Sequence, residues 1–277
     1  MKNTLRRNKL KIIKPEVKEL VQEDLFKQIE LCGRTCYKSE DRICEGSAEK
    51  FVNMLRNHAH GAMLEHGTVY LAIPDFNERD SEGKKLEAKV IHLLRNKYTK
   101  YKIGDDGTSY VTTNYRVIVE NDFEDLMNKY QTEYTTNFYR RRTFRITCNR
   151  GVTHEFVRHR VFSFAMESQR YVNYFKDKFG KEIKVIKPIY FEEESDLYAV
   201  WKNACERDEV DYFKLIELGA TPEKAREVLP NSCAAELIMT GFEEDWQHFF
   251  DLRCAHDAHP QAQEVANMIR ELFFRGI

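Results

Sequence analysis

The sequence lacks long apolar runs, an excess of charge of either sign and a secretion signal. No stretch approaches the roughly 20 apolar residues that a membrane-spanning helix needs, so we expect no membrane segment. The basic N-terminus has no apolar block after it, which excludes a signal peptide. The 44 Lys and Arg residues balance 45 Asp and Glu residues, so bulk attraction to nucleic acid is not expected. With 277 residues and 42% hydrophobic content, the composition is that of a globular protein.

An even set of paired cysteines is also missing. The sequence has 7 cysteines, an odd number scattered over a chain long enough to form its core without disulfides. This usage fits a reducing compartment, and we expect a cytoplasmic protein. Cys32 and Cys36 are followed only at a distance by His58 and His60, so free thiols are favoured over a zinc site and no metal is expected.

The pattern of apolar residues predicts a chain that mixes helices and strands. Helices are predicted over 16–31, 48–58, 86–98 and 121–130, and strands over 68–73, 110–119 and 143–148. Three further helices are predicted nearer the C-terminus. The first has Thr221 as N-cap and Pro222 at its first position, the second begins after Gly241, and the last begins with His259 and Pro260. Residues 75–109 are the most polar part of the chain. We therefore expect one mixed α+β domain over residues 1–277, with a polar insertion at about 75–109.

Basic residues are concentrated in residues 154–171. The segment contains Arg158, His159, Arg160, Ser163, Ser168 and Arg170. Cations this close repel one another unless an anion joins them, and the residues between them are apolar rather than acidic. Arginine forks and serine hydroxyls suit phosphate oxygens. The segment therefore predicts a site for a small phosphorylated ligand.

Two further basic positions are weaker signals. Arg226 and Arg253, taken alone, are more often surface ion-pair partners, and a lone His248 is more often a hydrogen-bonded core residue. Only their combination with residues 154–171 makes them candidates.

Other functional classes stay open at this level. A nucleic-acid-binding module could use Arg140, Arg141 and Arg142 together with the 158–170 cluster. A metal hydrolase could use His154, His159, His256 and His259, although no standard ligand spacing supports it. Ser168 is not favoured as a nucleophile, because the glycines of a nucleophile elbow are absent.

The spacing Arg158-His159-Arg160, seven residues, then Ser168 resembles the signature of flavin-dependent thymidylate synthases. Neighbouring blocks are similar to that family in the same order, over about half of the chain: HGAMLEH, RGVTHEFVRHR, SQRYVNY, AREVLPNS and HFFDLRCAHDAHP. The resemblance implies a mainly antiparallel sheet flanked by helices and a homotetramer with shared pockets. It also implies the reaction: a methylene passes from methylenetetrahydrofolate to C5 of dUMP, and FAD reduced by NADPH supplies the hydride that completes dTMP.

The resemblance also implies roles for individual residues. The dUMP site would comprise Glu155, Arg158, Glu167, Ser168, Gln169, Arg170, Arg226 and Arg253. The FAD site would comprise Ala62 through its main chain, Arg158, His159, Arg160 and His248, while His60 and Tyr171 would lie near the folate or nicotinamide. Arg253 would be the principal catalytic residue, because a cation fixed beforehand near the uracil oxygens stabilises negative charge as it develops.

The sequence departs from the family pattern at four of these neighbouring positions. Ala62 replaces the usual Ser or Thr, and Met166 stands where many members have Glu or Gln. Phe242 and Glu244 stand where some members place Asn and Arg toward FAD. We therefore expect no side-chain contact to FAD from these last two residues.

Overall fold

A four-stranded antiparallel sheet lies at the centre of the protein. The computed structural model describes residues 10–58, 60–75 and 81–275. The strand order is β2 (Glu16–Glu19), β6 (Arg141–Asn149), β9 (Ala234–Phe242) and β7 (Ser163–Met166). The sheet is antiparallel throughout, which confirms the predicted fold class.

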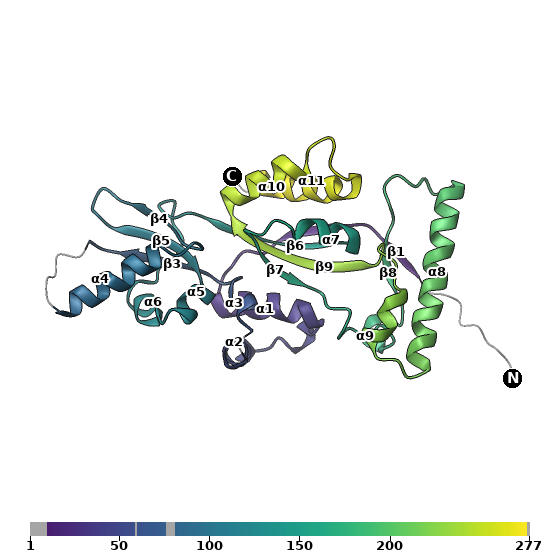
Figure 1. Ribbon diagram of the computed structural model, residues 1–277, viewed down its shortest axis with the longest axis horizontal. Coiled ribbons are helices and arrows are strands. Elements are labelled where there is room, and N and C mark those ends of the chain that lie inside the picture. The colour runs from purple at the N-terminus through teal and green to yellow at the C-terminus, as the bar shows by residue number, and fades with distance from the viewer. Residues whose placement is uncertain (1–9, 59, 76–80, 276–277) are drawn as a thin grey trace.

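Helices cover both faces of this central sheet (Figure 1). One face carries α7 (Arg150–Phe156), α10 (Glu243–Arg253) and α11 (Pro260–Arg275). The other carries α1 (Leu25–Tyr37) and α3 (Gly61–Leu64), with α2 (Ser47–Asn57) packed outside them. Side chains alternate along β9: Met239 joins the core under α10 and α11, whereas Ile238 packs toward Cys32 of α1.

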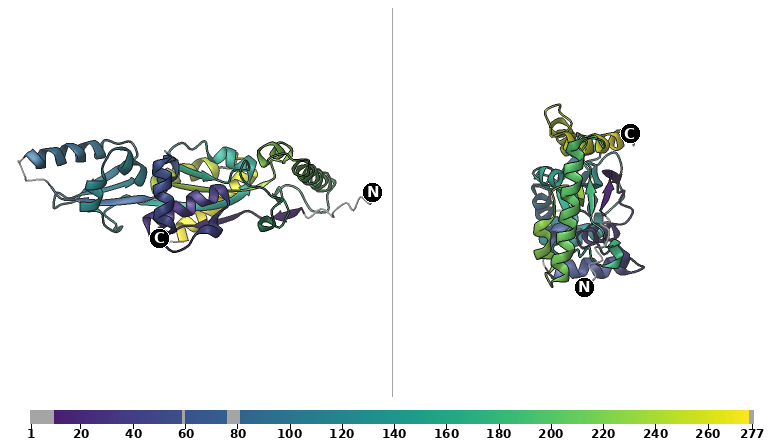
Figure 2. Two further views of the ribbon diagram at one scale, coloured as in Figure 1. Left: turned by 90° about the horizontal axis from the view of Figure 1, so that it is seen from below. Right: turned by 90° about the vertical axis from the view of Figure 1, so that its right-hand side faces the viewer.

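A second antiparallel sheet lies at one end of the elongated molecule (Figures 1 and 2). Its order is β3 (Thr68–Ile73), β5 (Ser109–Asn114) and β4 (Lys100–Ile103), and it packs with α4 (Ser81–Leu94), α5 (Tyr115–Glu120) and α6 (Glu124–Tyr130). The polar segment 75–109 therefore contributes a helix and a strand to this end of the molecule, and its Val90 and Leu93 join a hydrophobic core that α1, α2 and α3 share. That this segment is an insertion into one domain stays a prediction.

The opposite end is built around one long helix. There α8 (Asp196–Glu217) packs near the parallel pair β1 (Lys11–Ile13) and β8 (Lys184–Ile186). Short helices complete the chain: η1 (Glu40–Arg42), η2 (Asp177–Phe179), α9 (Pro222–Ala225) and η3 (Arg226–Val228).

Several predicted elements are confirmed and three are wrong in part. Residues 68–73 form β3, residues 143–148 lie within β6, and Thr221 is the N-cap of α9. The helix predicted over 16–31 begins only at Leu25, because residues 16–19 pair with β6 and the Asp24 side chain caps the helix. The strand predicted over 110–119 ends at Asn114, whose side chain accepts a hydrogen bond from Val117 N and starts α5. The helix predicted over 86–98 begins earlier and ends at Leu94.

Candidate functional site

The predicted site residues gather in two groups, one at each end of β7. Before β7 lie Arg158, His159 and Arg160, which meet α7 and α10; we call Glu155, Arg158, His159, Arg160, His248 and Arg253 the Arg253 group. After β7 lies the loop of residues 167–171, which faces Arg226 across a cavity that we call the Arg226 cavity. A four-residue strand at roughly 3.3 Å per residue separates them by about 13 Å.

The turn that carries the Arg253 group is held by aromatic packing. The Phe162 ring lies 4.6 Å from Trp246 of α10, measured between ring centroids. Gly241 of β9 makes this possible, since a Cβ at that position would lie 2.4 Å from Phe162 Cδ1. The close approach of ring to backbone fixes the start of β7 and the basic residues before it.

Arg253 is held within the chain by three hydrogen bonds. Its Nη1 donates to Glu155 Oε2 at 2.7 Å, its Nη2 donates to the Glu155 carbonyl at 2.8 Å, and its Nε donates to His159 Nε2 at 2.9 Å. Three of its five N–H groups are thus committed, which fixes the plane of the guanidinium. Glu155, predicted to bind dUMP, is here the ion-pair partner of Arg253.

His159 is held in its neutral form. Burial, the Arg253 guanidinium and nearby His248 lower the pKa of His159 to about 4. A neutral ring is also what the hydrogen bond requires, because Nε2 must be unprotonated to accept from Arg253.

The other basic residues of this group have no such partners. Arg158, Arg160 and His248 are exposed, and their side chains make no hydrogen bond or ion pair with the residues that the structure describes. This end of β7 therefore presents free donors beside one locked arginine.

The Arg226 cavity has a volume of about 360 Å³. Its basic lining residues are Arg150, Arg170 and Arg226. Arg150 Nη1 is buried without a hydrogen-bond partner among the described residues. Three guanidinium groups around one cavity suit it to an anionic ligand.

The loop of residues 167–171 is held by contacts with Cys36 and Cys233. Ser168 N donates to the Cys36 carbonyl at the end of α1 at 2.9 Å. Gln169 Nε2 lies 3.4 Å from Cys233 Sγ, and its side chain is buried. Of the predicted dUMP residues on this loop, Ser168 and Arg170 are the ones whose side chains make no hydrogen bond or ion pair with the described residues, and the Arg170 guanidinium lies 5.1 Å from the Tyr171 ring centroid.

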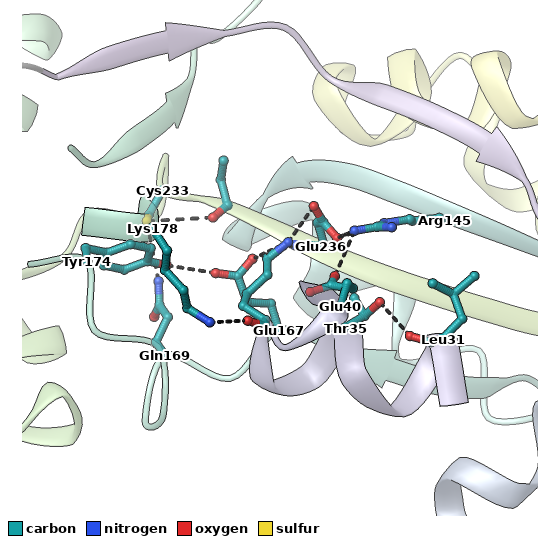
Figure 3. A network of polar contacts seen from close by, with 12 residues as sticks. Leu31, Thr35, Glu40, Arg145, Glu167, Gln169, Tyr174, Lys178, Cys233 and Glu236 are labelled. Carbon is teal, nitrogen blue, oxygen red and sulfur yellow. Dashed lines mark hydrogen bonds and ion pairs between the residues drawn. The ribbon is translucent and has the colours of Figure 1, made fainter. Parts of the chain in front are cut away.

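Glu167 points into a buried network rather than toward open space (Figure 3). Tyr174 Oη donates to Glu167 Oε1 at 3.0 Å, and Lys38 Nζ lies 3.6 Å from Oε2. Lys38 also pairs with Glu236 at 2.5 Å, and Glu236 pairs with Arg145. Burial raises the pKa of Glu167.

Some lining residues had no sequence-based role. Arg150 and Tyr37 line the cavity, and Lys38 pairs with its lining residue Glu167. Of these three, only Arg150 lies inside a block that resembles the family. Ala62 and His60 are exposed on and beside the short helix α3.

The structure disfavours nucleic-acid binding through residues 140–142. Arg142 is 3% exposed and forms two hydrogen bonds with Glu19 and one with the Phe273 carbonyl, each 2.6 Å long. Arg141 donates to the Glu65 carbonyl and Thr68. These side chains stabilise the fold, so they are not free to contact a phosphate backbone.

Two absences apply to the described ranges 10–58, 60–75 and 81–275. None of their helices is both long enough and apolar enough to span a membrane. Nor do they bring three His, Cys, Asp or Glu side chains into a group that could ligate a metal ion.

Uncommitted arginines on both sides of β7 are suited to small anionic ligands. Comparison with known proteins is more specific. Residues 139–276 match the family model described as "Thymidylate synthase complementing protein". The chain is 30% identical over 165 residues to the flavin-dependent thymidylate synthase of Pyrococcus furiosus, covering 58% of this chain and 67% of that one. It is also 30% identical over 133 residues to that of Corynebacterium glutamicum, covering 43% and 51%.

The chain therefore belongs to the flavin-dependent thymidylate synthase family. The family is named for its reaction, the flavin-dependent synthesis of thymidylate, and its members are methyltransferases. The solved structure of PolB from Streptomyces cacaoi, a UMP/dUMP methylase bound with 5-Br dUMP, is similar at 17% identity and a TM-score of 0.44, covering 96% of this chain and 93% of that chain.

Proposed function

We propose that this protein methylates dUMP reductively to dTMP, with methylenetetrahydrofolate as the carbon donor and FAD, reduced by NADPH, as the hydride carrier. Family membership and a cavity lined by three arginines support the proposal. The single observation that carries the substrate assignment is that Arg150, Arg170 and Arg226, from three separate segments, line one cavity.

The Arg226 cavity is the proposed dUMP site. Its volume of about 360 Å³ falls in the usual range for small-molecule pockets, roughly 300–1,000 Å³. Arg170 and Arg226 would bind the phosphate as planar forks, and the Ser168 hydroxyl would donate to the same oxygens. Met166 lines this cavity and offers no polar side-chain contact, so recognition there falls to the main chain.

The Arg253 group is the proposed site of chemistry. The free donors Arg158, Arg160 and His248 fit a cofactor with phosphates and an aromatic ring, and bound FAD would supply the hydride. Arg253 would hold a fixed positive charge beside the uracil, and Glu155 and His159 prevent it from turning away. Because His159 is neutral, it adds no competing charge to this field.

The separation of the two groups supports a shared site. The phosphate donors and Arg253 lie at opposite ends of β7, and Arg253 is not among the residues that line the Arg226 cavity. We propose a homotetramer in which the Arg253 group of one subunit completes the Arg226 cavity of another. All seven cysteines are free, which supports our placement of the protein in the cytoplasm.

One visible absorption spectrum tests this function. Purified protein should be yellow, its flavin band should be lost on reduction by NADPH and return in air, and dUMP should perturb the band. Tritium release from dUMP labelled at C5 should require methylenetetrahydrofolate. A colourless protein that binds oligonucleotides in a salt-sensitive way would contradict the proposal.

A further inference from the structure

Three sulfur-containing side chains lie together between α1 and α3. Cys32 and Cys36 are one turn apart on the same face of α1, and Met63 of α3 belongs to the same small cluster. Cys36 Sγ lies 3.8 Å from Met63 Sδ and 4.0 Å from the Cys32 carbonyl oxygen. The proposed reaction uses none of these side chains, which we call the sulfur cluster.

The sulfur cluster has apolar surroundings. Ala165 of β7 and Ile238 of β9 are fully buried beside Cys32, and Leu20 packs against them. Hard cations such as Mg²⁺ and Ca²⁺ require oxygen ligands, whereas thiolate and thioether sulfur select soft ions. The chemistry of this cluster therefore suits a soft metal ion.

Cys36 connects the sulfur cluster to the Arg226 cavity. It lines that cavity, whereas Cys32 is fully buried. Its carbonyl also accepts the hydrogen bond from Ser168 N that holds the loop of residues 167–171. A ligand can thus reach Cys36 from the cavity, and a shift of Cys36 would disturb the loop.

Both cysteines are neutral thiols at neutral pH. Burial raises the pKa of Cys36 to about 11 and raises the pKa of Cys32 more strongly. The thiolate is the form that attacks electrophiles and is oxidised, so these two cysteines are poorly suited to redox sensing. A metal ion can still bind them by displacing their protons.

We propose that Cys32, Cys36 and Met63 form a binding site for Cu(I). Two sulfur atoms that each lie about 2.3 Å from one ion are at most about 4.6 Å apart, so the 3.8 Å between Cys36 Sγ and Met63 Sδ is within reach. Each thiol releases its proton to solvent as its sulfur binds the ion. The copper stays monovalent, and no electron is transferred.

The charge of this site favours a monovalent ion. Two thiolates and one Cu(I) ion leave one net negative charge. Although burial dominates the pKa of Cys32, the Arg145 guanidinium acts in the opposite direction and favours the thiolate. The arginines that line the adjoining Arg226 cavity have the same sign. Zinc would be less suited, because its structural sites require four ligands and this cluster offers three.

Occupation of the site should oppose dUMP binding. An ion that draws Cys36 Sγ toward Cys32 and Met63 would shift the end of α1, and with it the carbonyl that holds Ser168 N. This consequence rests on the proposed function, whereas the metal site does not.

Competition with the chelator bicinchoninate, under anaerobic conditions, tests the site. The purified protein should withdraw a single Cu(I) ion per chain from the chelator and release about two protons for each ion bound. X-ray absorption at the copper edge should show sulfur ligands alone. Cys36→Ser should lose this binding, and Met63→Leu, a substitution of similar volume, should weaken it without disturbing the fold.

Matched controls change one thiol and one thioether elsewhere. Cys44 is exposed, and Met268 of α11 packs against a different hydrophobic core. Cys44→Ser and Met268→Leu should both keep Cu(I) binding. The proposal would be overturned if the wild type failed to compete with the chelator, if Cys36→Ser bound Cu(I) as tightly as the wild type, or if the copper spectrum showed nitrogen or oxygen ligands.

A titration with dUMP separates the site from the proposed function. Cu(I) should weaken dUMP binding by the wild type and should affect Met63→Leu less. Copper bound through these residues in a protein without synthase activity would leave the site standing while the function failed. Synthase activity without copper binding would overturn the site alone. Copper binding that left the affinity for dUMP unchanged would contradict the link to the Arg226 cavity.

Discussion

The two ends of β7 hold their arginines in opposite states. Arg253 is locked to Glu155 and His159 by three hydrogen bonds, whereas Arg150 keeps a buried donor without an acceptor. A group that is fixed before the substrate arrives stabilises charge without reorganisation. A group that lacks a partner gains one only when an anion binds. We therefore expect changes in the Arg253 group to lower kcat, and changes in the Arg226 cavity to raise KM for dUMP.

The largest effect should follow removal of Arg253. Arg253→Ala deletes the fixed cation and should lower kcat by about 10²–10³-fold, the usual cost of one preorganised electrostatic group. The protein should still bind FAD, which its visible spectrum would report. Turnover of dUMP is the measurement.

Two further variants sharpen this test. Arg253→Lys keeps the charge but loses the planar fork, so it should recover little activity. Glu155→Gln keeps the arginine but removes the carboxylate that orients it, and should give an intermediate loss. Unchanged synthase activity in Arg253→Ala would remove this residue from the mechanism.

The next effect concerns the buried network of Glu167 beside the Arg226 cavity. Lys38 pairs with both Glu167 and Glu236, and its backbone has a φ of 49° at the end of α1. Lys38→Met leaves two carboxylates without their shared cation and should lower the free energy of unfolding by about 2–3 kcal/mol. Chemical denaturation monitored by circular dichroism would measure it.

The network offers its own control. Adding Glu167→Gln to Lys38→Met removes one of the stranded charges and should restore part of the lost stability. Lys18→Met breaks an exposed pair with Glu16, with side-chain exposures of 68% and 59%, and should change stability by less than about 0.5 kcal/mol. Equal losses in the free energy of unfolding from Lys18→Met and Lys38→Met would show that the buried network stabilises the fold no more than an exposed ion pair does.

A smaller effect, on dUMP binding, is expected from Arg226 and Ser168, which line the Arg226 cavity. Arg226→Ala should raise KM for dUMP roughly tenfold, or about 1.4 kcal/mol, with less change in kcat. Ser168→Ala should weaken dUMP binding in the same sense. Exposed Arg207 on α8 provides the control, since Arg207→Ala should change neither constant.

An alternative outcome would reopen a discarded mechanism. If Ser168→Ala abolished turnover while dUMP still bound normally, a serine nucleophile would have to be reconsidered. If Arg226→Ala lowered kcat with no change in KM, the contrast between the two ends of β7 would be wrong.

The sequence predicted which residues lie close together better than it predicted how they are paired. Arg158, His159 and Arg160 could be assigned to a site because their spacing to Ser168 is local. The partnership of Arg253 with Glu155 could not, because it joins α10 to α7 across 98 positions of the chain. The β2 strand was missed for the same reason, since its apolar spacing also fits a helix and only pairing with β6 decides between them.

The two ends of β7 should also respond to pH with opposite signs. The pKa of His159 is lowered to about 4 in the folded protein, so below about 6.5 the unfolded chain binds a proton that the folded chain does not. Its contribution to stability is therefore lost as the pH falls from 6.5 toward 4. The pKa of Glu167 is raised, so the folded chain keeps a proton that the unfolded chain releases above about 4.5, and that contribution is lost as the pH rises.

Single variants separate these two contributions. Measured by denaturation at a series of pH values, His159→Asn should gain stability relative to the wild type as the pH falls below 6.5, by at most about 1.4 kcal/mol per pH unit. Glu167→Gln should gain relative to the wild type as the pH rises above about 4.5. Parallel pH profiles for both variants and the wild type would mean that neither group has a shifted pKa in the folded protein. The pKa difference between the Arg253 group and the Arg226 cavity, which the contacts of His159 and Glu167 indicate, would then not exist.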